Sequence, residues 1–162
     1  MKLFLIGLPG CGKSTAGRKL ANSLGVDFVD LDDEIVKITR QEISETFEQF
    51  GEEYFRERET EALRTVIKNE QDMIVSCGGG APCFHDNLKL MKSAGQVIFL
   101  DVSIEEIVKR LTNDTGRPLL ANGDQKLRLN QLYAERIQYY QQADHIIKND
   151  GDPLKDLRLL VP

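Results

Sequence analysis

The stretch Gly7-Leu8-Pro9-Gly10-Cys11-Gly12-Lys13-Ser14-Thr15 decides the fold, and it follows directly after the apolar run Lys2 to Ile6. Its outer glycines and its Lys-Ser pair fit the pattern G-x-x-x-x-G-K-[ST] of the phosphate-binding loop (P-loop), which joins a buried strand to a helix. In such a loop the backbone N–H groups and the helix N-terminus converge on phosphate oxygens. The stretch therefore predicts binding of ATP or GTP together with Mg²⁺.

Individual roles follow from this pattern. Lys13 is expected to contact the β- and γ-phosphates, and the Ser14 hydroxyl to bind Mg²⁺. The other residues expected to contact the nucleotide through the loop and the first helical turn are Gly10, Cys11, Gly12 and Thr15. The alternative is a tight strand-to-helix turn with a chance lysine, which the complete pattern and its context disfavour.

Size and composition limit the remaining possibilities. The chain has 162 residues, a net charge of -5 and three cysteines. This length suits a single domain spanning residues 1–162, and we expect a monomer. The acidic balance argues against nucleic acid or an anionic membrane as the main partner. The odd number of cysteines, with no secretory segment, favours a reducing, cytoplasmic compartment.

Apolar runs alternate with helical patterns along the rest of the chain. Strands are expected near residues 2–6, 27–30, 73–77, 96–100 and 145–147; helices are expected near 13–24, 32–69 with interruptions near Arg40 and Gly51, from 103, 124–142, and from 153. This alternation predicts an α/β fold with a five-stranded parallel sheet covered on both faces. Ligands of such sheets bind beyond the carboxyl ends of the strands. Both glycine runs of this chain, Gly7 to Gly12 and Gly78 to Gly80, fall at such ends.

The P-loop alone does not distinguish kinases from GTPases, motors or nucleotide-binding regulators. A guanine-reading Asn-Lys-x-Asp motif is missing, since the nearest candidate is Lys148-Asn149-Asp150. A small kinase instead requires an acceptor pocket, a lid, and groups that hold a hydroxyl in line with the γ-phosphate.

Six segments, taken together with their order and spacing along the chain, resemble the shikimate kinase family over nearly the whole chain. They are GLPGCGKST, Asp30 to Ile35, Phe55 to Glu59, Gly78 to Gly80, Arg117 to Leu120, and Arg136 followed by Tyr140. The resemblance implies the three-layer α/β/α P-loop kinase fold, with an acceptor-binding region at about 31–60 and a lid at about 113–123. It also implies ATP-dependent phosphorylation of shikimate on its 3-hydroxyl, giving shikimate 3-phosphate and ADP for aromatic amino-acid synthesis through chorismate.

On this resemblance, Asp32 contacts the shikimate hydroxyls and orients or deprotonates the one that is attacked. The alternative for Asp32 is a helix N-cap, a position that favours aspartate. Asp30 resembles a carboxylate that lies behind the direct Mg²⁺ ligands.

Arg56 and Arg136 match the two family arginines that bind the shikimate carboxylate, in accord with the preference of carboxylates for guanidinium groups. The alternatives are exposed ion pairs for Arg56 and a surface helix residue for Arg136. Glu59, one turn from Arg56, is expected to hold that guanidinium in place. The N–H groups of Gly78, Gly79 and Gly80 are expected at the shikimate hydroxyls, with a flexible turn as the alternative.

Arg117, in the expected lid, is the third catalytic candidate, closing over the γ-phosphate; the alternative is a solvated loop arginine. Arg110 resembles the family arginine that stacks on adenine, and Pro153 is expected to pack on the same base. The acidic segment 149–152 departs from the family pattern, which often has a basic residue there.

Other hypotheses remain open at this stage. Gluconate kinase, whose acceptor is also a carboxylate polyol, is the alternative small-molecule kinase; a nucleoside monophosphate kinase is less favoured because its lid usually carries several arginines. A nucleotide-binding regulator is the alternative from another class. Cys11, beside a helix N-terminus, is a candidate for ready ionisation and oxidation.

Overall fold

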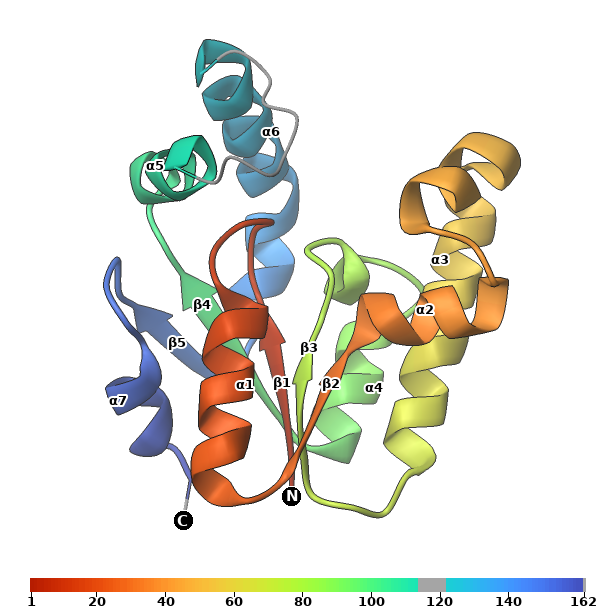
Figure 1. Ribbon diagram of the computed structural model, residues 1–162, viewed down its shortest axis with the longest axis vertical. Coiled ribbons are helices and arrows are strands. Elements are labelled where there is room, and N and C mark those ends of the chain that lie inside the picture. Colours follow the sequence, from red (N-terminus) through yellow and green to blue (C-terminus); the bar gives the residue numbers. More distant parts are fainter. Residues whose placement is uncertain (114–121, 162) are drawn as a thin grey trace.

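A computed structural model describes residues 1–113 and 122–161 of the chain (Figure 1). Among these residues the strands are β1 (Lys2–Ile6), β2 (Asp27–Asp30), β3 (Met73–Ser76), β4 (Gln96–Asp101) and β5 (His145–Lys148). The helices are α1 (Lys13–Leu24), α2 (Leu31–Thr39), α3 (Ile43–Lys68), α4 (Asn87–Ala94), α5 (Ile104–Asn113), α6 (Asn122–Tyr140) and α7 (Leu154–Arg158), and a 3₁₀ turn, η1, spans Ala81–Cys83.

The described strands form one five-stranded sheet in the order β2-β3-β1-β4-β5. Every neighbouring pair is parallel, and β1 pairs with β3 on one side and β4 on the other. Phe4, Leu5 and Ile6 of this central strand are fully buried, as expected for a strand covered on both faces. The predicted five-stranded parallel sheet is therefore confirmed.

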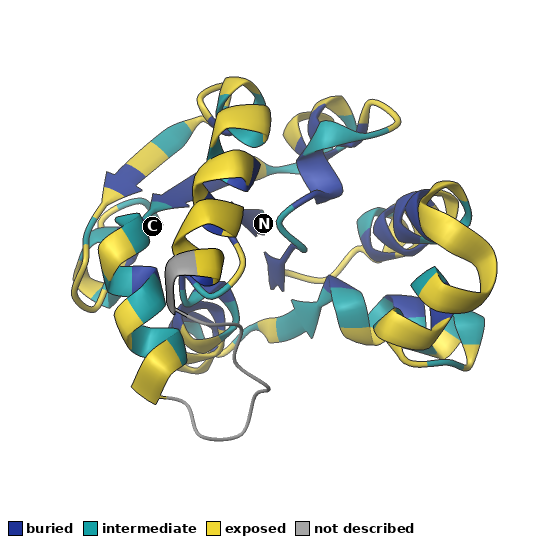
Figure 2. Ribbon diagram, turned by 90° about the horizontal axis from the view of Figure 1, so that it is seen from above, coloured by how far each residue is buried: buried dark blue, intermediate teal, exposed yellow. Residues whose placement is uncertain are grey.

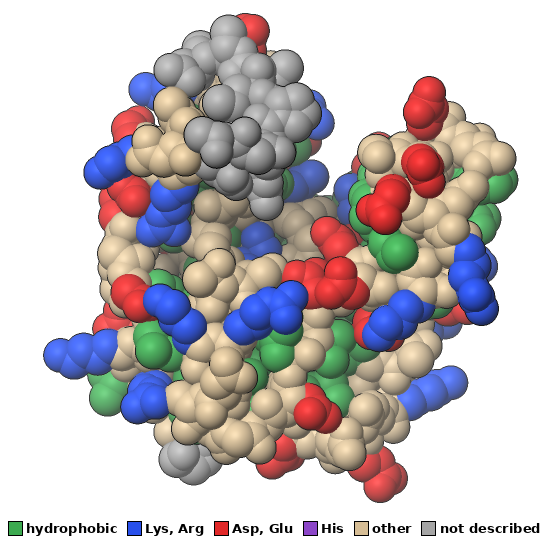
Figure 3. Space-filling view, in the orientation of Figure 1, with side chains coloured by type: hydrophobic (Ala, Val, Ile, Leu, Met, Phe, Trp, Pro, Cys, Tyr) green, Lys and Arg blue, Asp and Glu red, His purple; other side chains and the backbone are tan. Residues whose placement is uncertain are grey.

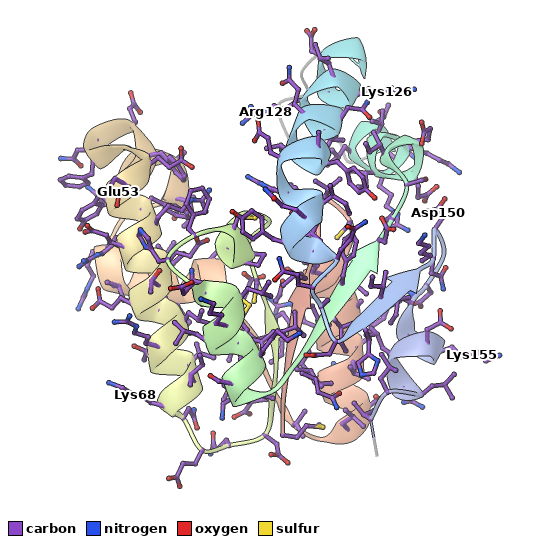
Figure 4. The ribbon with its side chains drawn as sticks, turned by 180° about the vertical axis from the view of Figure 1, so that it is seen from behind. Glu53, Lys68, Lys126, Arg128, Asp150 and Lys155 are labelled. Atoms are coloured by element: carbon purple, nitrogen blue, oxygen red, sulfur yellow. The ribbon has the colours of Figure 1, made fainter. Side chains whose placement is uncertain are left out.

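Helices cover both faces of the sheet. In Figure 1, α1 and α7 lie in front of the sheet, and Figure 4, seen from behind, shows α3, α4 and α6 on the opposite face. The buried residues lie mainly in the inner strands β1, β3 and β4 and on parts of the helices, whereas the edge strands β2 and β5 are largely intermediate or exposed (Figure 2). The three-layer α/β/α arrangement is thus the one expected from the alternating pattern.

Both predicted interruptions of the region 32–69 are present. Arg40 adopts a left-handed conformation (φ 57°) and ends α2. Gly51 (φ 80°) has non-helical angles inside α3 and produces a kink there. These breaks separate a short helix that directly follows β2 from the long helix that carries Arg56 and Glu59.

Two local expectations need correction. Helix α4 was not predicted, because its eight residues bury only Asn87, Leu88 and Met91 and give too short a periodic pattern. The spacing of Ser103 and Glu106 in the sequence fits a capping box at the start of α5, but the structure forms only half of it. The Ser103 hydroxyl accepts from the Glu106 N–H (3.2 Å), but the Ser103 N–H donates to Asp150 (2.8 Å), and Glu106 instead pairs with Arg110 (3.0 Å).

Within residues 1–113 and 122–161, none of the helices combines the length and apolar character that crossing a bilayer requires.

Candidate active site

The P-loop leaves β1 and enters α1 through three glycines with left-handed backbone angles: Gly7 (φ 146°), Gly10 (φ 79°) and Gly12 (φ 93°). Residues with a Cβ rarely adopt such angles, and a Cβ on Gly7 would also lie 2.7 Å from the backbone oxygen of Leu100. The three glycines therefore allow the chain to turn tightly and to direct the first N–H groups of α1 toward the loop interior.

Lys13 is the first residue of α1, and its side chain is buried inside the loop. Its ammonium group donates to the carbonyl oxygens of Gly7 (2.9 Å) and Leu8 (2.8 Å). These two carbonyls hold the positive charge of Lys13 against the backbone of the loop, where it could meet a phosphate bound there.

Ser14, Asp30 and Ser76 form a polar contact between three elements. The Ser14 hydroxyl donates to Asp30 Oδ2 (2.6 Å) and lies 3.0 Å from the Ser76 hydroxyl. The other oxygen of Asp30 accepts from the Asp32 N–H (3.1 Å) and so caps α2. The alternative role of Asp32 as N-cap is therefore wrong, because Asp30 occupies that position and Asp32 lies in the first turn of the helix.

The carboxyl group of Asp32 is half-buried and faces the second glycine run. Burial raises its pKa above the usual value, and the nearby charges of Asp30 and Asp33 act in the same direction, while Lys13 opposes them. A carboxylate that is partly dehydrated and unused as a cap is suited to accept a proton or a hydroxyl hydrogen bond.

The second glycine run follows β3, and charged side chains pack directly against its backbone. A Cβ on Gly78 would lie 3.2 Å from Asp32 Oδ1 and 3.3 Å from Glu59 Oε2. A Cβ on Gly79 would lie 2.8 Å from Arg136 Nη1, and one on Gly80 would lie 2.5 Å from Arg56 Nη2. The close approach expected at these three glycines is confirmed, and the neighbours are four ionisable side chains from three other helices.

Arg56 and Glu59 form a buried ion pair on α3. Arg56 Nη1 lies 2.8 Å from Glu59 Oε1, and the side chains are only 7% and 1% exposed. Glu52 approaches the same guanidinium at 3.3 Å. Burial raises the pKa of Glu59, although Arg56 partly opposes the shift. The exposed-ion-pair alternative for Arg56 is therefore wrong, and the expected contact with Glu59 is confirmed.

Helix α6 brings two polar groups to Gly79. The Tyr140 hydroxyl donates to the Gly79 carbonyl (2.6 Å), and Arg136, one turn earlier on the same helix, lies against the same glycine. Burial raises the pKa of Tyr140, so that its hydroxyl stays protonated and keeps this hydrogen bond. Arg136 is accordingly placed at the glycine run by a buried anchor on its own helix.

The two glycine runs touch. A Cβ on Gly79 would lie 3.0 Å from Pro9 Cδ and 3.3 Å from the Gly7 carbonyl oxygen. Figure 3 shows the surface hollowed between the part of the chain carrying α2 and α3 and the part carrying α5 and α6, with basic side chains within the hollow and acidic ones at its rim. A phosphate bound on the first loop would therefore face a ligand bound on the second.

The P-loop opens to a pocket of about 480 Å³, whose lining includes Gly10, Cys11, Gly12, Lys13, Ser14, Thr15, Arg110 and Pro153. All eight residues predicted to contact the nucleotide are thus brought together. Arg110 links the P-loop to the segment 149–152, because its guanidinium donates to the carbonyls of Cys11 (3.2 Å) and Asp150 (2.8 Å).

Comparison with known proteins agrees with this geometry. The family described as shikimate kinase matches residues 9–158. A shikimate kinase from Francisella philomiragia is 39% identical over 156 residues, which cover 96% of this chain and 89% of that protein. The chain belongs to the shikimate kinase family.

Solved shikimate kinases have the same fold as this family member. The enzyme from Bacteroides thetaiotaomicron superposes with a TM-score of 0.93 at 31% identity, covering 99% of this chain and 97% of that one. The enzyme from Acinetobacter baumannii, solved in complex with shikimate, gives a TM-score of 0.86 at 34% identity, covering 98% and 92% of the two chains. The expected shikimate kinase fold and activity class are confirmed.

The carboxylates of the acidic segment 149–152 have local partners that stabilise their ionised form. Asp150 accepts two hydrogen bonds from Ser103, at 2.8 Å each, which lower its pKa. Asp152 pairs with Lys19 at 2.8 Å, and this contact lowers its pKa. Both carboxylates are therefore compensated at the edge of the nucleotide pocket.

The predictions on reactivity and closure both remain predictions. Cys11 is only 1% exposed, which disfavours attack on its thiol in this conformation, although the residue lines the pocket at the P-loop. Arg117 lies outside the described residues, as do positions 114–121 of the expected lid at 113–123.

Three contributors to the site were not predicted. Ser76 ends β3 beside Ser14, and a polar residue at the end of an apolar strand was the available signal. Tyr140 was noted only as part of a matching segment, and its bond to Gly79 was not foreseen. Phe84 lies over Arg56, and no local pattern in the sequence indicated that contact.

Proposed function

We propose that this chain transfers the γ-phosphoryl group of ATP to the 3-hydroxyl of shikimate, with ATP on the P-loop and shikimate on the glycine run 78–80. The observation that carries this proposal is the contact between the two loops, at Gly79 and Pro9. One loop offers N–H groups and Lys13 to a phosphate, and the other is surrounded by Arg56, Arg136 and Asp32. Membership of the shikimate kinase family supports shikimate over gluconate as the acceptor.

On the nucleotide side, Lys13 spreads the charge that develops on the γ-phosphoryl group. Ser14 and Asp30 fit Mg²⁺, because hydroxyl and carboxylate oxygens are the ligands that it prefers, and it commonly uses few protein ligands together with substrate phosphates. Ser14 would bind the ion directly and Asp30 would lie behind it, and the bound ion would neutralise phosphate charge.

On the acceptor side, Arg56 and Arg136 bind the shikimate carboxylate, and the N–H groups of the glycine run 78–80 approach its hydroxyls. Asp32 orients the 3-hydroxyl and takes its proton as the oxygen–phosphorus bond forms and the bond to ADP breaks. The raised pKa of Asp32 makes it a stronger base than an exposed aspartate.

Three further roles complete the proposal. Arg117 closes over the γ-phosphate, and Arg110 and Pro153 contact the adenine. The position of Arg110 and Pro153 in the pocket at the P-loop supports their part of the proposal. We also infer that the chain acts as a monomer, without a nucleic-acid partner, in the cytoplasm; light scattering at assay concentration tests the first of these.

A coupled ADP-release assay tests the proposed function. Shikimate and gluconate are compared as acceptors at saturating ATP, with and without EDTA, and the product is identified by phosphorus NMR. We expect release of ADP with shikimate but not with gluconate, and shikimate 3-phosphate as the product. Activity should be lost when EDTA chelates Mg²⁺. Turnover of gluconate but not of shikimate, or phosphorylation at another hydroxyl, would overturn the proposal.

A further inference from the structure

The segment Phe84 to Asn87, between η1 and α4, has no role in the proposed chemistry, yet it lies directly on Arg56. The Arg56 Cζ atom is 4.1 Å from the centroid of the Phe84 ring, closer than its 5.1 Å distance to the ring of its own neighbour Phe55. Phe84 is half-buried and is not part of the main hydrophobic core.

The Phe84 ring lies closer to the Arg56 guanidinium than the Phe55 ring does and adds to the restraint from Gly80 and from the hydrogen bonds at the guanidinium edges. Glu59 and Glu52 accept hydrogen bonds from the edges of the guanidinium plane, at 2.8 Å from Nη1 and 3.3 Å from Nη2. Hydrogen bonds at the edges fix the position of the group but permit it to tilt. An aromatic ring against one face opposes that tilt and adds an electrostatic attraction between the cation and the π face.

The chain around Phe84 is itself held firmly. His85 (φ 50°) and Asp86 (φ 57°) both adopt left-handed angles that residues other than glycine rarely adopt. The Asn87 N–H donates to the Phe84 carbonyl (2.9 Å), and the buried Asn87 amide donates to the Ala81 carbonyl (3.0 Å). Backbone angles of this kind persist only where the surroundings enforce them.

His85 ties the same segment to α3. Its Nδ1 atom lies 3.2 Å from the Thr60 hydroxyl, which donates its proton to the carbonyl oxygen of Arg56 (3.0 Å). On the other side of the ring, Nε2 lies 3.4 Å from Glu53, which projects from the upper half of α3 (Figure 4).

We propose that Phe84 is a positioning residue for the acceptor: it fixes the plane of the Arg56 guanidinium so that its remaining hydrogen-bond donors face the acceptor's carboxylate. This inference rests on the proposed function for its consequence in binding, although the restraint on Arg56 exists before any acceptor binds. The order of the ligand-free side chain thereby lowers the entropy lost on binding.

The test compares Phe84→Leu, which keeps apolar bulk but removes the π face, with Phe84→Tyr, which keeps the ring. Phe28→Leu is the matched control, because Phe28 is also half-buried and also lies under an arginine, with Arg18 Cζ 4.5 Å from its ring centroid. Calorimetry should show that Phe84→Leu raises the dissociation constant for shikimate about tenfold. Phe84→Tyr and Phe28→Leu should each change it less than about twofold, and the KM for ATP should not change.

A double-mutant cycle establishes whether Phe84 acts through Arg56. In an Arg56→Lys background the tenfold loss caused by Phe84→Leu should largely disappear, because lysine lacks the planar group that the ring restrains. An undiminished loss in that background would mean that Phe84 does not act through the guanidinium of Arg56, and an equal loss in Phe84→Tyr would mean that the aromatic ring is not what matters; either result would overturn the proposal.

A measurement without an acceptor separates this inference from the proposed function. The Nε–H signal of Arg56 in proton–nitrogen NMR should exchange with solvent about tenfold faster in Phe84→Leu than in the wild type and Phe28→Leu. Unchanged exchange overturns the positioning role whatever the acceptor is. Faster exchange in a protein that does not bind shikimate would retain the role and reject the proposed acceptor.

Discussion

The nucleotide side and the acceptor side of the site are built in different ways. On the nucleotide side, one continuous stretch supplies the glycine turn, the helix N-terminus and Lys13, and most ligand contacts are expected from backbone groups. On the acceptor side, the glycine run 78–80 supplies only backbone, and the charges come from side chains on α2, α3 and α6.

This difference has an energetic consequence. Backbone N–H groups in a helix N-terminus are oriented by the helix itself and need no further support. Buried charged side chains lose hydration, which other groups must offset, and Arg56 accordingly has Glu59 at 2.8 Å. Substitutions on the nucleotide side should therefore lower mainly the rate of phosphoryl transfer. Substitutions on the acceptor side should lower mainly the stability of the protein and its affinity for the acceptor.

The largest expected effect is on chemistry. Lys13→Ala should lower kcat by about 10²-fold or more, because it removes charge stabilisation in the transition state, and unfolding should change little by comparison. The coupled ADP assay measures this, with Lys89→Ala, whose side chain is 82% exposed, as the control. A near-normal kcat in Lys13→Ala would remove the distinction between the two sides.

The next effect is on stability. Glu59→Ala should lower the free energy of unfolding by about 3 kcal/mol, because it leaves the buried Arg56 cation without its closest partner. Glu57→Ala, on the same helix but 52% exposed, should cost less than about 1 kcal/mol. Urea denaturation measures both, and equal losses would show that burial of the Arg56–Glu59 pair is unimportant.

Arg136 tests affinity on the acceptor side. Arg136→Ala should raise the dissociation constant for shikimate about tenfold or more, because a charge-assisted hydrogen bond is lost, and should leave that for ATP nearly unchanged. Arg128→Ala, an exposed position on the same helix (Figure 4), is the control for calorimetry. A parallel loss for both ligands would contradict the assignment.

The pH dependence should report Asp32. As a proton acceptor it must be ionised, so kcat/KM for shikimate should fall as the pH decreases through its pKa, which lies above the usual 3.8. Asp33→Asn removes a like charge that raises this pKa, so the acid limb should shift to lower pH. A limb that stays in place or moves upward would exclude Asp32 as the titrating group.

The smallest effect is expected at the edge of the nucleotide pocket. Asp152→Asn should lower the KM for ATP by about twofold, since it frees Lys19 from an exposed ion pair and removes a negative charge from the pocket lining. Initial-rate kinetics with varied ATP measures the change. A higher KM would mean that Asp152 itself supports nucleotide binding.

The same difference between the two sides explains what the sequence could predict. The five strands, the P-loop and the break at Gly51 depend on local patterns, and the structure agrees with them, whereas the order of the strands in the sheet was not predicted. Asp30 and Asp32 are close in the chain and both occur at favourable capping positions. The sequence therefore left open whether Asp32 caps the helix, and the hydrogen bond from Asp32 N–H to Asp30 shows that Asp30 is the cap.

The remaining features depend on contacts between distant elements. The turn that places Phe84 over Arg56 contains His85 and Asp86 with left-handed backbone angles. A histidine or an aspartate in a sequence does not predict such angles as a glycine does. Asp150 and Asp152 read as a break in the family pattern because their partners, Ser103 and Lys19, lie elsewhere in the chain. Local propensity cannot report such pairings, because they form only when the sheet brings the elements together.

The adjacency of β1 and β3 has a consequence for the evolution of the site. The ladder between these strands continues to the hydrogen bond from Cys77 N–H to the Leu5 carbonyl (3.0 Å), immediately before both glycine turns. Lateral spacing in a sheet is about 4.8 Å, and each residue advances a strand by about 3.3 Å, close to the separation of reacting atoms of about 3–3.5 Å. Inserting one residue into β1 or β3 before its glycine turn would thus shift one turn along the sheet relative to the other by about 3.3 Å, whereas insertions in loops away from these strands would leave their register intact.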